Sequence, residues 1–138
     1  MEISTQFGTQ EIDPDSIITL PQGMLGFSDL TRYKLFHEED KPTVFWLQSV
    51  DDPAIQFPVA SPDMFQVDYE ITLSDEELEL LELKNIEDTT LLVTLSKPSG
   101  DASQVQPNLL APIIINMEQR RGLQKSLNQV ASHVLIRA

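Results

Sequence analysis

The fold of this chain is best predicted from the stretch TVFWLQSVDDPAIQFPVA, residues 43–60. Residues 43–50 are rich in β-branched and aromatic side chains, which favours a strand. Residues 55–60 form a second apolar run, and the short DDPA segment between the two runs has the Asp and Pro residues of a turn. The stretch therefore predicts a strand–turn–strand hairpin. Pro58 donates no ladder hydrogen bond, so it predicts an edge position or a bulge.

Further short strands are predicted on both sides of this hairpin. They span residues 3–7, 16–20, 33–38, 65–73, 90–96, 110–117 and the tail HVLIR, 133–137. Residues 65–73 alternate apolar and polar side chains, which predicts one buried face and one wet face. Residues 122–130 fit either a strand or a helix. One helix is predicted to begin after Ser74, because Ser74 and Glu77 have the spacing of a capping box. Many short strands with one helix predict an all-β barrel or sandwich.

The composition indicates one soluble domain over residues 1–138. A chain of 138 residues with 41% hydrophobic content can bury a core of its own. It has no cysteine, which excludes disulfides, thiolate nucleophiles and cysteine-ligated zinc. The first residues lack the basic and apolar regions of a signal peptide. The longest mainly apolar run, 109–115, is far short of the ~20 residues that cross a bilayer. We expect a cytoplasmic protein with no membrane contact.

The chain is strongly and unevenly acidic. Its net charge is −13 and its pI is about 4.3. Residues 1–101 carry 21 acids and 5 bases, whereas residues 102–138 carry one acid and four bases. Such a surface repels phosphate, so direct nucleic-acid binding is not expected. The charge favours cationic partners, although the alternative that it only keeps the protein soluble remains open.

The adjacent carboxylates Asp51 and Asp52 are the main candidates for chemistry. They could form part of a metal site or a general acid/base pair, or they could belong to a binding surface or a structural turn. The two histidines, His37 and His133, are far apart in the sequence, and there is no metal-ligand spacing or Gly-rich phosphate loop. We therefore predict no catalytic residue, no metal and no cofactor. The alternative is a small metal-dependent hydrolase that uses Asp51 and Asp52 with Asp68 or Glu70.

Four segments of the chain carry a family resemblance. They are LPQGMLGF (20–27), WLQSVDDPAIQFPV (46–59), PDMFQVDYEITL (62–73) and NLLAPIIIN (108–116), and the last is followed by GLQ (122–124). In this order and spacing they closely resemble the flagellar assembly factor family, FliW. The resemblance runs from near residue 1 to about residue 127.

The resemblance implies a non-enzymatic regulator with a mainly antiparallel, β-barrel-like all-β fold and one or two short helices. It implies two partners, flagellin and the carbon storage regulator CsrA, a basic RNA-binding homodimer that represses flagellin translation. It also implies that the free factor antagonises CsrA allosterically, away from the RNA-binding surface. We expect the factor to be monomeric when it is free.

Five residues are predicted to contact a protein partner. Asp51 and Asp52 lie on the hairpin turn, and Asp68 and Glu70 lie on the wet face of the 65–73 strand. Asn116 completes the set, although a polar residue in an apolar strand is more often satisfied internally. The acidic run at 75–77 fits helix capping and could also serve a partner.

Overall fold

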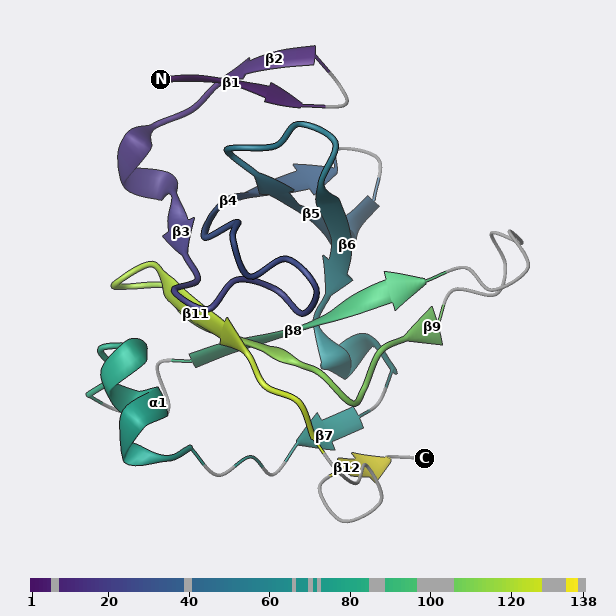
Figure 1. Ribbon diagram of the computed structural model, residues 1–138. Coiled ribbons are helices and arrows are strands. Elements are labelled where there is room, and N and C mark those ends of the chain that lie inside the picture. The colour runs from purple at the N-terminus through teal and green to yellow at the C-terminus, as the bar shows by residue number, and fades with distance from the viewer. Residues whose placement is uncertain are drawn as a thin grey trace.

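The computed structural model describes residues 1–5, 8–38, 41–65, 67–69, 71, 73–84, 89–96, 106–127 and 134–136 (Figure 1). Its strands are β1 (Glu2–Thr5), β2 (Gly8–Glu11), β3 (Ile18–Thr19), β4 (Arg32–Glu38), β5 (Lys41–Ser49), β6 (Gln56–Ala60), β7 (Val67–Tyr69), β8 (Thr89–Ser96), β9 (Gln106–Pro107), β10 (Ile113–Asn116), β11 (Arg121–Gln124) and β12 (Val134–Ile136). Its helices are α1 (Asp75–Leu80) and the 3₁₀ turns η1 (Pro14–Ser16) and η2 (Pro62–Phe65).

Seven of these strands close into a barrel. Their order is β10-β11-β3-β4-β5-β6-β8, and β8 pairs again with β10 to complete the ring. All neighbours are antiparallel except β11 and β3, which are parallel, so the barrel is mixed. β9 extends the outer end of β8, while β1–β2 and β12–β7 form two separate pairs. The predicted β-barrel-like fold with a short helix is confirmed.

The side chains of β10 alternate between two cores. Ile113 and Ile115 lie in the cluster inside the barrel, with Leu47, Tyr33 and other residues of the facing strands. Ile114 points the other way and packs with Leu123 and Leu81 in an outer cluster. This alternation is what a strand buried on both faces requires.

The outer cluster is a row of apolar side chains that helix α1 covers. Leu91 of β8 and Leu123 of β11 are the cross-strand partners of Ile114, so the three side chains share one face of the sheet. Leu81, at the C-terminal end of α1, is fully buried against this row. Figure 1 shows α1 beside β11 and β8 at the lower side of the barrel.

The hairpin of β5 and β6 forms as the sequence predicts. Trp46 pairs with Pro58 across it, and the ladder between β6 and β8 begins only at Val59. Pro58 therefore lies in the part of β6 that has no second neighbour, although β6 as a whole is an interior strand. The predicted edge position of Pro58 is confirmed.

The predicted strand over residues 65–73 was wrong in its length. Residues 62–65 form η2, and the strand among the described residues of this segment is β7, residues 67–69. The Ser61 hydroxyl oxygen accepts the Asp63 N–H at 3.3 Å, and Pro62 has the fixed φ that suits a helical first position. These two local preferences turn the chain before the alternating pattern begins.

The remaining sequence predictions have mixed outcomes. The strands at 33–38, 43–50 and 90–96 are confirmed as β4, β5 and β8, and the tail strand as β12. The ambiguous segment forms the strand β11 at its start. The 16–20 strand is shortened to β3 because Asp13 caps η1 directly before it. Residues 97–105, between β8 and β9, lie outside the described residues.

Candidate partner-binding surface

The carboxylate of Asp52 holds the turn between β5 and β6. Its Oδ1 accepts the N–H of Ala54 at 3.0 Å. The hydroxyl oxygen of Ser49 accepts the N–H groups of both aspartates, from Asp51 at 3.2 Å and from Asp52 at 3.0 Å. The buried amide of Gln48 donates to two carbonyls of the same turn, Ser49 at 3.1 Å and Ile55 at 3.2 Å. Polar side chains thus fix this turn, as local Asp and Ser chemistry predicts.

Asp51 is paired with a cation that the sequence does not reveal. The guanidinium of Arg32, at the start of β4, donates to both carboxylate oxygens of Asp51, from Nε to Oδ2 at 3.2 Å and from a terminal nitrogen to Oδ1. The hydrogen bond and the charge of Asp51 raise the pKa of Arg32. Both side chains are about half exposed, and such surface pairs contribute only ~0–1 kcal/mol to stability. Asp51 therefore faces solvent as one half of an ion pair.

Asn116 is buried and hydrogen-bonded inside the protein. Its Nδ2 donates to the carbonyl of Leu81 at 2.9 Å and to that of Glu82 at 3.3 Å. Its Oδ1 accepts the N–H of Gln119 at 3.3 Å. The side chain therefore ties the end of β10 to the last turn of α1. Its role as a partner contact stays a prediction.

The predicted contact residues that the structure describes do not form one cluster. The β5–β6 turn lies near the top of Figure 1, beside the β1–β2 hairpin, whereas β7 lies at the bottom beside β12. Asp68 is in the middle of β7, where its backbone is paired with Leu135. Glu70 lies outside the described residues. The structure thus places Asp51 and Asp52 at one end of the molecule and Asp68 at the other.

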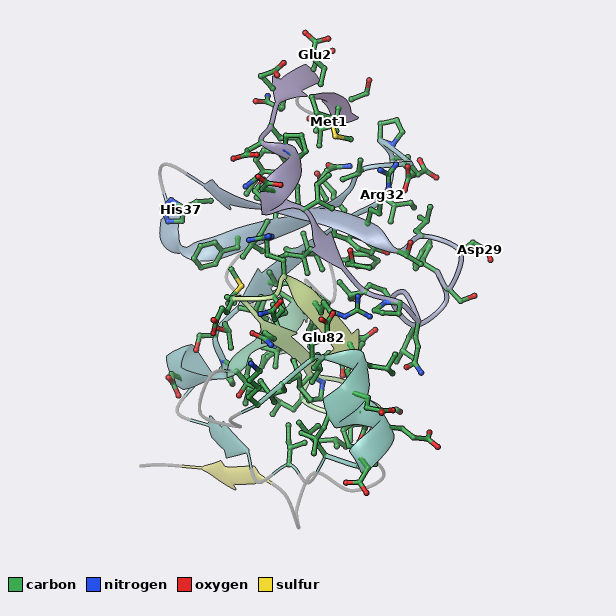
Figure 2. The ribbon with its side chains drawn as sticks, turned by 90° about the vertical axis from the view of Figure 1, so that its left-hand side faces the viewer. Met1, Glu2, Asp29, Arg32, His37 and Glu82 are labelled. Atoms are coloured by element: carbon green, nitrogen blue, oxygen red, sulfur yellow. The ribbon has the colours of Figure 1, made fainter. Side chains whose placement is uncertain are left out.

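Helix α1 presents a second group of carboxylates. Its exposed acids are Asp75, Glu76, Glu79 and, just after its end, Glu82. Figure 2 shows carboxylate oxygens projecting outward from this helix, with Glu82 labelled at its upper end. The sequence predicts the capping chemistry of this run, and the structure confirms it: Ser74 and Glu77 form both hydrogen bonds of a capping box.

Glu77 has a second partner that sequence reasoning missed. Its carboxylate accepts two hydrogen bonds from Lys125 Nζ, at 2.7 and 2.9 Å. Burial raises the pKa of Glu77, but the hydrogen bonds from Lys125 and Ser74 outweigh burial and lower that pKa overall. The two residues are 48 positions apart, and no spacing rule links them. Glu77 is therefore occupied inside the protein, and Glu82 is also paired, with Arg121 Nε at 3.0 Å.

Within the part of the chain that the structure describes, no group of three His, Asp or Glu side chains could hold a metal ion. The ring of His37 lies beside that of Phe45, with centroids 5.1 Å apart, and His133 lies outside the described residues. Figure 2 shows His37 on the outer side of the barrel, far from Glu82. No helix among the described residues is long and apolar enough to span a membrane.

The chain is similar to a set of known proteins along nearly its whole length. The family model described as FliW protein matches residues 2–137. The flagellar assembly factor FliW of Chromobacterium violaceum is 42% identical over 132 residues, which cover 89% of this chain and 90% of that protein. The flagellar assembly factor FliW of Azoarcus sp. (strain BH72) is 38% identical over 140 residues, which cover 97% of this chain and 95% of that protein. A crystal structure of a flagellar assembly factor FliW matches with a TM-score of 0.83 at 33% identity, covering 94% of this chain and 90% of that chain.

Proposed function

Because this chain belongs to the FliW family of flagellar assembly factors, we propose that it binds flagellin in the cytoplasm and, when free, binds the translational regulator CsrA. In this proposal it acts as one monomeric domain, residues 1–138. Exported flagellin leaves free factor behind, and this factor captures CsrA and relieves the repression of flagellin translation. Two partners that compete for one factor form a mass-action switch whose set point is the concentration of free flagellin.

The FliW family is non-enzymatic, so the alternative of a metal-dependent hydrolase was wrong. The geometry agrees with this conclusion. Asp51 is paired with Arg32, and the carboxylate of Asp52 holds the turn. Asp68 lies at the opposite end of the molecule. These carboxylates therefore do not converge on one position where a metal ion or a substrate could bind.

The net charge of −13 is the observation that carries the proposed binding of CsrA. A basic homodimer is attracted to an acidic factor, and the attraction increases the rate of encounter at low salt. The bound acidic factor also repels the phosphates of incoming RNA. A coupling free energy of about 1–3 kcal/mol is typical of allostery and lowers affinity about 5–150-fold, which suffices to release a messenger RNA.

We test the acidic contacts with two matched double variants. Asp51→Asn with Asp52→Asn removes two charges and keeps an amide oxygen that can accept the Ala54 N–H. Glu76→Gln with Glu79→Gln removes two charges from the exposed side of α1. If the turn contacts CsrA, the first variant binds CsrA about tenfold more weakly and with a flatter salt dependence, while the second changes little.

The measurement is a titration of CsrA by calorimetry at low and at physiological ionic strength (about 0.15 M), repeated with flagellin present. Equal losses in the two double variants would show that only overall charge matters and that Asp51 and Asp52 make no contact. Absence of CsrA binding by the natural sequence at low salt would overturn the proposed regulatory function. Failure of flagellin to displace CsrA would overturn the switch.

A further inference from the structure

The side chain of Gln124 joins two loops that lie far apart in the sequence. Its Oε1 accepts the N–H of Leu25 at 2.8 Å, and its Nε2 donates to the carbonyl of Ala111 at 3.1 Å. One amide at the end of β11 therefore fastens the loop that follows β3 to the loop that precedes β10. These contacts also bring together three of the segments that carry the family resemblance: 20–27, 108–116 and 122–124.

Each of the two loops exposes a leucine at this junction. Leu25 is 56% exposed and Leu110 is 47% exposed, so they are among the few large apolar side chains that the described residues leave in solvent. Leu25 occupies a turn closed by the Phe27 N–H and the Met24 carbonyl at 2.8 Å. The Leu110 carbonyl accepts the N–H of Leu127 at 2.7 Å. A single exposed leucine needs no explanation, but here two exposed leucines lie on loops whose backbones are held by the same amide, so each loop is fixed before a partner binds. We call these two leucines and their loops the apolar patch.

The patch is free of charge in a strongly charged protein. Neither residues 20–28 nor residues 106–117 contain an Asp, Glu, Lys or Arg, although the chain as a whole is 22% charged. Lys125, next to Gln124, is neutralised by Glu77 at 2.7 Å. A basic partner therefore gains nothing at the patch and is drawn to the acidic surface instead. An apolar segment with little charge can bury the two leucines. It has no basic groups that would need the carboxylates as partners, so binding away from them costs it no favourable contact.

We propose that Leu25 and Leu110 form the docking site for an apolar, charge-poor segment of flagellin, with contacts distinct from the carboxylates Asp51 and Asp52 proposed to meet CsrA. The competition between the two partners then requires that the bulk of bound flagellin covers those carboxylates. This inference rests on the proposed function and assigns one of its two partners to a surface. The leucines act as anchors that are buried on binding, and Gln124 is a positioning residue that holds their loops in register.

The experiment compares Leu25→Gln and Leu110→Gln with Met117→Gln. Met117 is 44% exposed and follows the opposite end of β10, so it controls for the loss of an exposed apolar side chain elsewhere. We expect each leucine variant to bind purified flagellin at least about tenfold more weakly, and Met117→Gln to bind it normally. Binding of CsrA should stay within about twofold for all three variants. Thermal melting checks that each variant is folded, and Leu25→Ala and Leu110→Ala replace any variant that is not.

The results separate this inference from the function on which it rests. Normal flagellin binding by both folded leucine variants would overturn the patch and leave the proposed function intact. Loss of CsrA binding with normal flagellin binding would assign the patch to the other partner and would also overturn the inference. If the natural sequence bound CsrA but no flagellin, the flagellin half of the proposed function would be overturned, and the inference with it.

Discussion

At the scale of single residues, Gly23 decides the path of the loop between β3 and β4. Its φ is +67°, and a Cβ atom built there would lie 2.4 Å from the carbonyl oxygen of Phe27 and 2.8 Å from the Cα of Ser28. Both are backbone atoms, so they cannot rotate away as a side chain could. The loop carries Met24 into the inner core, where Met24 is 2% exposed. Only glycine allows this path.

We predict that Gly23→Ala destabilises the protein strongly and that Gly26→Ala does so only moderately. Gly26 also has a positive φ, +84°, but a Cβ there would meet nothing within 4 Å. Gly26→Ala should therefore cost the left-handed strain alone, about 1–2 kcal/mol in the free energy of unfolding. Gly23→Ala should cost about 2 kcal/mol more, because overpacking adds to the strain. Urea denaturation of the two variants measures the difference, and equal losses would contradict the predicted clash.

Residue-level chemistry could be predicted from the sequence only where it is local. The turn at Asp51 and Asp52 follows from the preferences of Asp, Pro and Ser, and the structure shows those hydrogen bonds. The ion pair of Asp51 with Arg32 spans 19 positions, and no local rule indicates it. The hydrogen bond from the Leu25 N–H to Gln124 spans 99 positions, so the sequence could not predict the apolar patch either.

At the scale of elements, α1 depends on contacts with the rest of the molecule. It has six residues, and isolated helices of that length are not stable in water. Its first turn is held by the capping box of Ser74 and Glu77 and by the contact of Glu77 with Lys125. Its last turn is held by the buried Leu81 and by the amide of Asn116. The helix is thus fixed at both ends.

We predict that Glu77 makes the stability of the protein sensitive to acid. Its pKa in the folded state is lowered from 4.5, so its stabilising effect is fully present above that value and is lost as the pH falls through the folded-state pKa. Glu77→Gln should cost about 1 kcal/mol at pH 7, since it weakens contacts to a charged amine that is partly exposed. Its free energy of unfolding should then fall less steeply than that of the natural sequence between about pH 5 and pH 3.

Chemical denaturation across this pH range tests the prediction, with Glu79→Gln as the control. Glu79 is an exposed carboxylate on the same helix and takes no part in the capping box or in the contact with Lys125. The control should follow the pH dependence of the natural sequence. An unchanged acid profile for Glu77→Gln would show that the contact with Lys125 contributes nothing to stability.

The predictions of helices and strands were confirmed where one hydrophobic periodicity or one capping motif dominated the local sequence. The helix cap at Ser74 and the strands β4, β5 and β8 are examples. The 65–73 segment failed because an alternating pattern competed with the turn preferences of Ser61 and Pro62, which act first along the chain. The parallel contact of β11 with β3 joins residues about 100 positions apart, and periodicity carries no information about such pairing.

At the scale of the whole molecule, the barrel closes through contacts that only the fold creates. Short strands and turns predict a barrel or a sandwich equally well, and the pairing of β8 with β10 decides between them. That pairing places Leu92 beside Ile113 inside the barrel and Leu91 beside Ile114 outside it. The register between β8 and β10 therefore determines which side chains enter the inner core and which enter the outer one. A shift of one residue would move each side chain to the other core.

The net charge of −13 leads to a last prediction for the whole molecule, which concerns its stability in salt. Self-repulsion of a compact, acidic protein destabilises the folded state, and salt screens it. Exposed ion pairs such as Arg32 with Asp51 are weakened by the same salt, but each contributes little. We therefore expect added NaCl to raise the melting temperature at pH 7. Between about 0.01 M and 0.1 M, where the Debye length falls from about 30 Å to 10 Å, the rise should be about 4 °C, as about 1 kcal/mol produces in a domain of this size.

Differential scanning calorimetry measures this rise, and the double variant Glu76→Gln with Glu79→Gln sets its scale. The variant carries two fewer negative charges on α1, so its melting temperature should be higher in low salt and should rise less as salt is added. A melting temperature that falls with salt would show that attractive pairs outweigh the repulsion. In that case the attractive ion pairs would neutralise more of the carboxylates locally, and the field around the protein that attracts a basic partner would be weaker than the net charge indicates.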